Sequence, residues 1–139
     1  MLKEIQIESS QYFERFRESM RLSWELRGRT KQYASAIMRF YVKLPKDRDE
    51  VRVLGKQLVR SGTSVAAHSR EASRARSDAE FCSKLDCLLQ EADESQLWLE
   101  LLRDDCAIRG GTTDQLLHET DELLAIFATM AAKLRKSGI

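Results

Sequence analysis

Apolar residues recur at alternating spacings of four and three through the C-terminal half of the chain, and this pattern constrains the fold more than any other feature. In the last segment the repeat consists of Leu116, Thr120, Leu123, Phe127, Met130 and Leu134. In the segment before it the repeat consists of Phe81, Leu85, Leu88, Ala92, Ser95, Leu99, Leu102 and Cys106. Positions with this spacing share one face of an α-helix, and in packed helices that face meets a neighbour. The pattern therefore predicts two long amphipathic helices.

Local signals predict where these two helices begin and end. Ser77 and Glu80 have the S-x-x-E spacing of a capping box, so the earlier helix is predicted to begin at Ser77. It is predicted to run to Arg109 and to end at Gly110-Gly111, because glycine tolerates the left-handed backbone that closes a helix. A second capping box, headed by Thr112, is predicted to begin the last helix.

The N-terminal half predicts two further helices of a bundle. One is expected over residues 47–73, and its apolar stripe is predicted to be Val51, Leu54, Leu58, Ser61, Val65, His68 and Ala72. Gly62 lowers the helix propensity of this segment, which indicates that a neighbouring helix approaches closely there. The other helix is predicted to end at Leu44, because the residue before Pro45 is disfavoured in the helical region.

An amphipathic segment at residues 1–25 precedes this bundle, with Tyr12, Phe13, Phe16, Met20 and Trp24 as its large apolar residues. It is predicted to form an N-terminal helical extension. Gly28 either separates this extension from the first bundle helix or lies inside one long helix that includes both. The connections are short, which places consecutive helices antiparallel. The predicted fold class is all-α, an up-down-up-down antiparallel four-helix bundle over residues 26–139.

The sequence carries no pattern typical of an enzyme or a metal protein. Its three cysteines are odd in number and lack CxxC spacing, which argues against a disulfide framework and a zinc site. It has no paired ExxH motifs for a di-iron centre, no GxGxxG loop and no P-loop. We therefore expect no catalytic residue, no cofactor and no metal. No apolar run is long enough to span a bilayer and no secretory signal is recognised, so the expected compartment is the cytoplasm, without membrane association.

Charge is divided unevenly along the chain, although the formal net charge is only +1. Residues 1–76 hold 17 Lys and Arg against 9 Asp and Glu, whereas residues 77–139 hold 6 against 13. Such asymmetry is typical of a nucleic-acid surface, or of helices or subunits that neutralise one another. The hypothetical phosphate-binding residues are Arg27, Arg29 and Lys31 in one cluster and Arg70, Arg74 and Arg76 in another. Aromatic residues near them are sparse, so base stacking is not indicated, and solvent exposure or pairing with the acidic helix is the alternative.

Polar side chains form a stripe beside the apolar one on the second bundle helix. The stripe and its neighbours comprise Gln57, Arg60, Ser64, His68 and Glu71, and Glu94 lies midway along the acidic helix that follows. One interpretation is a structural network of ion pairs and hydrogen bonds that fixes how the two helices are aligned. The other interpretation is a contact with a subunit or a ligand.

The order of residues from the second bundle helix onward resembles that of the proteins encoded in the intervening sequences of bacterial 23S rRNA genes. The positions that carry the resemblance are Gln57-Leu58, Arg60, Ser64-Val65, Glu71, Ser77, Glu80-Phe81 and Glu94. The chain departs from the family pattern at His68, where the family has Asn, and at Ala72, where it has Gly.

This resemblance implies a non-enzymatic, cytoplasmic four-helix bundle that assembles into a homopentamer and has a role linked to ribosomal RNA intervening sequences. More distantly, the chain resembles the accessory protein of diversity-generating retroelements, which binds a reverse transcriptase and RNA. RNA is therefore one expected partner. The alternative is an accessory subunit that binds a partner enzyme, together with nucleic acid, through residues 1–25.

Overall fold

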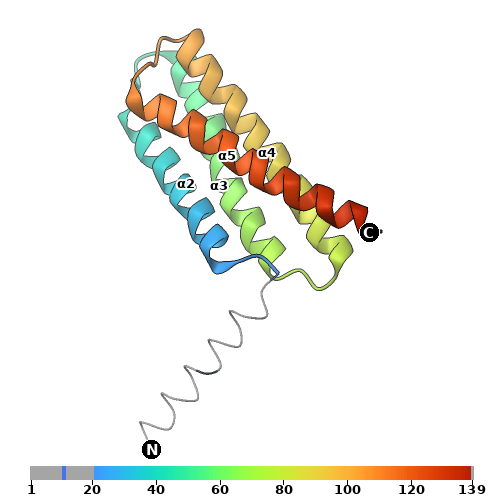
Figure 1. Cartoon of the computed structure of the whole chain (residues 1–139). Coiled ribbons are helices and arrows are strands. Elements are labelled where there is room, and N and C mark those ends of the chain that lie inside the picture. Colours follow the sequence, from blue (N-terminus) through green and yellow to red (C-terminus); the bar gives the residue numbers. More distant parts are fainter. Residues whose placement is uncertain (1–10, 12–20, 139) are drawn as a thin grey trace, which may run out of the picture.

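The structure, a computed structural model, describes residue 11 and residues 21–138. Four helices make up this part of the chain: α2 at Trp24–Lys43, α3 at Asp49–Ser73, α4 at Asp78–Asp104 and α5 at Gly111–Lys136. They alternate in direction, and no strand occurs among the described residues (Figure 1). The predicted all-α four-helix bundle is confirmed. The predicted N-terminal extension falls mostly on residues that the structure does not describe.

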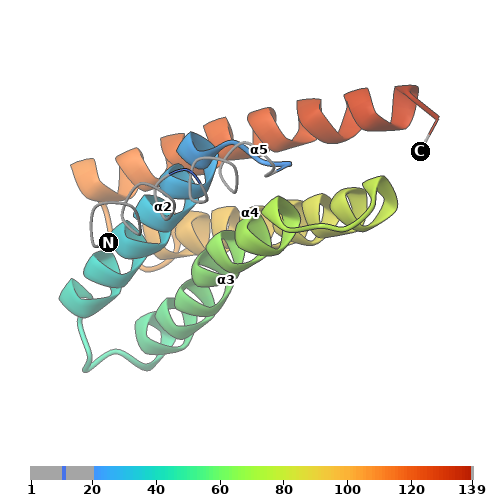
Figure 2. The ribbon, with the colours of Figure 1, turned by 90° about the horizontal axis from the view of Figure 1, so that it is seen from below.

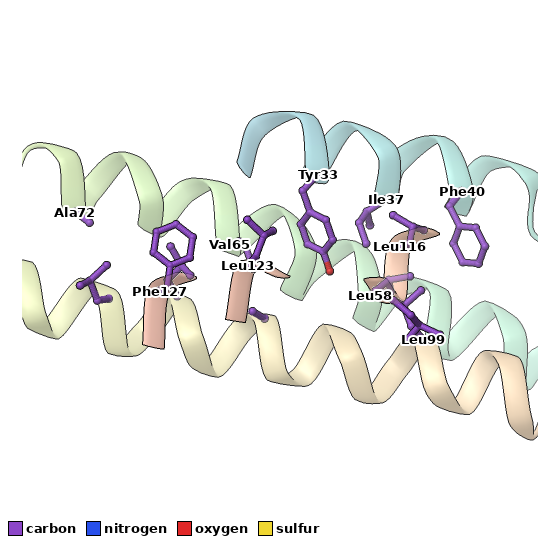
Figure 3. Packing of buried hydrophobic residues seen from close by; sticks show 14 of the residues in the cluster. Tyr33, Ile37, Phe40, Leu58, Val65, Ala72, Leu99, Leu116, Leu123 and Phe127 are labelled. Carbon is purple, nitrogen blue, oxygen red and sulfur yellow. The ribbon is translucent and has the colours of Figure 1, made fainter. Parts of the chain in front are cut away.

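Consecutive helices lie side by side in chain order (Figure 2). Among the four contacts between neighbouring helices, the one between α5 and α2 is the smallest. None of these helices combines the length and the apolar character that a membrane crossing requires, as judged over the described residues. The core runs along the inner faces of all four helices (Figure 3). Its largest fully buried side chains include Tyr33, Ile37, Leu58, Leu99, Leu123 and Phe127.

The predicted apolar stripe of α4 is confirmed at every position, because each of its members from Phe81 to Cys106 is buried. The stripe of α3 departs from the prediction at two places. Gly55 and Ser69 are buried, whereas Leu54 and His68, the preceding residues, are only half-buried. The buried residues Val51, Gly55, Leu58, Gly62, Val65, Ser69 and Ala72 still recur at spacings of four and three. The predicted period is therefore right, but the face of α3 that packs against its neighbours is centred slightly to one side of the predicted stripe.

A similar shift appears at the end of α5. Ala131 is almost fully buried, whereas the predicted Met130 and Leu134 pack only partly against the core. Leu116, Thr120, Leu123 and Phe127 are buried as predicted.

Two glycines on α3 allow α2 to approach closely. A Cβ atom on Gly62 would lie 3.0 Å from Cγ1 of Ile37, and one on Gly55 would lie 3.0 Å from Cδ1 of Leu44. The predicted close approach at Gly62 is therefore confirmed. Ile37 lies in α2 and Leu44 directly follows it, so these glycines set the distance between α2 and α3.

A buried polar layer crosses the middle of the bundle, with one residue from each helix. The hydroxyl of Tyr33 on α2 lies 2.6 Å from Oγ1 of Thr120 on α5. Oγ of Ser61 on α3 lies 2.7 Å from Oγ of Ser95 on α4. Burial raises the pKa of Tyr33 to about 12, although its hydrogen bond with Thr120 acts in the opposite direction. Buried hydroxyls need partners, so this layer favours one alignment of the four helices.

The start of α4 and the end of α2 follow the predictions. Oγ of Ser77 accepts a hydrogen bond from the backbone N–H of Glu80 at 3.0 Å, so Ser77 caps α4 as predicted. Leu44 is extended, and α2 ends before it. At the other end of α2, Ser23 caps the helix, and Gly28 lies inside it rather than at its start. Trp24, assigned to the extension from the sequence, therefore belongs to the first turn of α2.

The predicted end of α4 and start of α5 are wrong. Helix α4 ends at Asp104, five residues before Arg109, because Ala107 takes the left-handed conformation with φ 58°. The N–H of Ile108 then donates to the carbonyl of Leu102 at 2.9 Å. Gly110, with φ 143°, uses its conformational freedom to begin α5 rather than to end α4.

The capping box predicted at Thr112 is therefore absent. Helix α5 begins at Gly111, one residue earlier, and no side chain caps it. Thr113 instead donates its hydroxyl to the carbonyl of Ile108 at 3.1 Å, which ties the first turn of α5 to the loop before it.

Candidate nucleic-acid interface

The residues just before α2 are fixed against the turn between α3 and α4. The backbone N–H of Arg21 donates to the carbonyl of Ser73 at 3.2 Å, and its Nε donates to the carbonyl of Ala75 at 3.0 Å. Its guanidinium also pairs with Asp78 in the first turn of α4. The next residue, Leu22, is fully buried. Two basic segments that are far apart in the sequence thus meet at one end of the bundle (Figure 1).

Arg27 from the first predicted cluster lies near Arg70 and Arg74 from the second. Burial lowers the pKa of Arg27, and the positive charges of Arg70 and Arg74 lower it further. Like charges held together in this way create a local positive potential that favours an anion. We call Arg27, Arg70, Arg74 and the adjacent Trp24 the cationic end.

Trp24 is a member of this site that the sequence interpretation missed. Its side chain is among the exposed large hydrophobic residues, at 39%. The guanidinium carbon of Arg27 lies 5.0 Å from the centre of its ring, which is a cation–π distance. The signal in the sequence was the spacing of three between Trp24 and Arg27, which puts both on one side of a helix. It was overlooked because Trp24 was assigned to the extension.

The other three predicted phosphate-binding residues, Arg29, Arg76 and Lys31, are not part of the cationic end. Nε of Arg29 donates to Glu119 on α5 at 3.1 Å, and its guanidinium also pairs with Glu122. These hydrogen bonds raise the pKa of Arg29, with the bond to Glu119 as the larger cause. Arg76 is 91% exposed on the turn, 3.8 Å from Glu80. Lys31 is exposed on α2.

The residues of the predicted polar network lie in two separate groups on the surface between α3 and α4. In the first group Arg60 binds Oε1 of Gln57 at 3.2 Å and Oε2 of Glu91 at 3.1 Å, and it also pairs with Glu94. The hydroxyl of Ser64 donates to the carbonyl of Arg60 at 2.7 Å. The hydrogen bond with Glu94 raises the pKa of Arg60. The sequence interpretation included Glu94 but missed Glu91, three residues earlier on the same face of α4.

The second group forms one helical turn before the α3–α4 connection. Nδ1 of His68 lies 3.3 Å from Glu71, and Nζ of Lys84 on α4 lies 2.8 Å from the same carboxylate oxygen. The hydrogen bond from Lys84 is the main cause that lowers the pKa of Glu71. His68 therefore takes part in a surface network and does not occupy the core position predicted for it. Lys84 was not identified from the sequence.

A groove with a volume of about 1190 Å³ lies between α2 and the start of α5, where these two helices make their small contact. Tyr33, Phe40 and Leu116 line its apolar part, and the ion pair between Arg29 and Glu119 lies along its wall. The described residues contain no group of three or more His, Cys, Asp and Glu side chains arranged to hold a metal ion. The groove offers space and mixed charge, whereas the cationic end brings three arginines close together.

Comparison with known proteins identifies the family. The model of the 23S rRNA-intervening sequence protein family matches residues 24–129, which include all of α2, α3 and α4 and most of α5. No curated protein matches the chain significantly.

A crystal structure at 1.70 Å resolution of a protein with unknown function, from the S23 ribosomal protein family of Bacteroides thetaiotaomicron VPI-5482, is similar in fold and in sequence. It is 32% identical with a TM-score of 0.69, over 76% of this chain and 96% of that chain. The range matched by the family model includes the cationic end and the Arg60 network. The chain belongs to the 23S rRNA-intervening sequence protein family.

Proposed function

We propose that the protein is a non-enzymatic, oligomeric scaffold of the cytoplasm that binds RNA phosphates at its cationic end. The observation that carries this proposal is the convergence of Arg27 with Arg70 and Arg74 from two segments more than 40 residues apart. Arginine recognises phosphate with paired N–H donors, and contacts of this kind hold the nucleic-acid backbone without reading its sequence. The membership in an rRNA intervening-sequence family supports RNA as the anion.

The homopentamer implied by the family resemblance is part of this proposal. Several large apolar side chains are exposed on the outer faces of the bundle, namely Met38, Val42, Val53 and Leu97. Assembly would remove some of this surface from water. It would also multiply the cationic ends on one particle, which strengthens binding to a long RNA through avidity. Sedimentation equilibrium distinguishes a 16.0 kDa monomer from a particle of five chains.

The alternative function is an accessory subunit that binds a partner enzyme through residues 1–25. It stays a prediction, because most of that segment lies outside the described residues.

RNA binding is tested by charge reversal at the cationic end with a matched control. The variant Arg70→Glu/Arg74→Glu is compared with Lys43→Glu/Lys56→Glu, which changes the formal charge equally at exposed positions away from this end. We expect the first variant to lose about 100-fold in affinity for RNA near 50 mM salt and to flatten the dependence of affinity on salt, because fewer counterions are released. The control should stay within a few-fold of wild type, a margin of less than about 1 kcal/mol. Equal losses in both variants would contradict a localised phosphate site.

A further inference from the structure

We infer that Trp24 and Arg27 form a stacking site for an unpaired base, so that the RNA held by the cationic end is single-stranded at this point. This inference rests on the proposed RNA-binding function and specifies which class of RNA the site accepts.

The geometry places a flat aromatic ring at the edge of a group of positive charges. Trp24 lies in the first turn of α2, where the hydroxyl of Ser23 accepts the N–H of Leu26 at 3.2 Å and so fixes the start of the helix. The guanidinium of Arg27 lies one turn further along, 5.0 Å from the centre of the ring. More than a third of the Trp24 side chain is exposed to solvent. Arg70 at the end of α3 and Arg74 directly after it place further positive charge near Arg27.

This arrangement matches what a single strand offers and a duplex does not. The faces of a base inside an A-form helix are covered by its neighbours, and the major groove is too narrow for side chains to read. An unpaired base presents both faces, which can stack on an aromatic ring or on the guanidinium plane of an arginine. The adjacent phosphates then lie near the positive charge of Arg70 and Arg74. A site for phosphate alone needs the arginines but gains nothing from an exposed indole.

The second tryptophan of the chain lacks these surroundings. Trp98 lies in α4, is half-buried and packs against the core. Its helix carries the acidic residues that bind Arg60, so its region does not attract a polyanion. The two tryptophans therefore differ in both exposure and charge, and only Trp24 combines an exposed ring with neighbouring arginines.

The test uses the full chain and two RNA probes of equal length, an unstructured oligonucleotide and a duplex. Affinities are measured at one salt concentration for wild type, Trp24→Leu and Trp24→Phe. Leucine removes the aromatic face but keeps an apolar side chain, whereas phenylalanine keeps a face for stacking. We expect Trp24→Leu to lose about 5- to 100-fold in affinity for the single strand and to bind the duplex as wild type does. Trp24→Phe should retain most of the affinity for the single strand.

A second measurement needs no change at the site. In a Trp98→Phe background, Trp24 is the single source of tryptophan fluorescence, and stacking of a base should quench it when the single strand binds. The duplex should leave the emission almost unchanged. A single strand that binds without quenching would overturn the inference.

The outcomes separate this inference from the function on which it rests. If wild type binds RNA with a strong dependence on salt but Trp24→Leu binds the single strand equally well, the stacking site is refuted and RNA binding stands. The same conclusion follows if Trp24→Leu weakens both probes equally. If wild type binds neither probe, both the proposed function and the stacking site are refuted.

Discussion

Arg60 and Arg27 are the same residue type on the surface of one bundle, yet the charged side chains that shift their pKa values are opposite in sign. Across from Arg60, helix α4 provides the carboxylates of Glu91 and Glu94. Across from Arg27, the end of α3 provides Arg70 and Arg74. The pKa of Arg60 is raised, mainly by its hydrogen bond with Glu94, whereas the pKa of Arg27 is lowered, first by burial and then by its positive neighbours.

The difference shows that the basic and acidic halves of the chain do not neutralise each other evenly. Carboxylates of the acidic half lie beside Arg60 in the middle of α3 and beside Arg29 on α2. At the α2 start the neighbours across the interface include two further arginines, so positive charge accumulates there. Neutralisation by the acidic half is therefore seen at Arg60 and Arg29, whereas Arg27 lies near other arginines.

The largest effect we predict extends this comparison from surface charges to a buried ionisable group. Tyr33 has its pKa raised to about 12 from a usual value of 10.0, so the folded state holds the proton more tightly than the unfolded state. Stability should be unaffected below pH 10 and should fall between pH 10 and 12, by up to about 3 kcal/mol. Urea unfolding at several alkaline pH values measures this. Tyr33→Phe should remove the loss, and Tyr41→Phe on the same helix should keep it.

The next prediction concerns a variant in which the two regions have the same sign of charge. Replacing Glu91 and Glu94 with lysine surrounds Arg60 with positive charge and should create a second cationic surface. We expect RNA affinity at low salt to rise on the order of 10-fold and its dependence on salt to become steeper, because additional phosphates are neutralised. Filter-binding titrations across a salt series test this. An unchanged slope would mean that positive charge alone, without the arrangement at the cationic end, does not bind RNA.

A smaller effect concerns how much Arg60 and Arg70 each contribute to the stability of the fold. Arg60→Gln removes attraction to two carboxylates and should destabilise the fold by about 0.2–1 kcal/mol, the range for exposed ion pairs. Arg70→Gln removes repulsion from Arg27 and should leave the stability unchanged or slightly raised. Adding salt should reduce both differences, because it screens surface charges. Thermal unfolding of the two variants would contradict the comparison if Arg70→Gln lowered the melting temperature as much as Arg60→Gln.

The smallest effect concerns Glu71, which lies between the two regions and binds Lys84. Its lowered pKa means that the carboxylate stabilises the fold above its usual pKa of 4.5 and that this contribution is lost as the pH falls. Lys84→Gln should therefore weaken the fold slightly at pH 7 and not at pH 3. Unfolding midpoints at these two pH values measure the effect. An equal loss at both would indicate that Lys84 acts through packing instead.

The site was less predictable than the fold. The six residues of the proposed polar network contact one another or their neighbours as two groups, but the acidic partner Glu91 and the basic partner Lys84 were not identified. Of the two basic clusters, Arg27, Arg70 and Arg74 come together, whereas Arg29 is bound by α5. Trp24 was assigned to the wrong segment, because no local signal distinguished Ser23 from the other serines as the start of α2.

The sequence by itself determined the features that depend on neighbours along the chain. The 3.6-residue period sets the apolar faces of α4 and most of α5, the pre-proline position ends α2, and Ser77 caps α4. Only the tertiary structure decided the rest. The left-handed turn at Ala107 and the one-residue shift to Ser69 arise from how the helices pack against one another. The arginines compared above each have a carboxylate or another arginine as a neighbour, and that neighbour lies 30 to 90 positions away in the sequence. The strength of an electrostatic interaction depends on distance in space, so only the folded structure determines which charges interact.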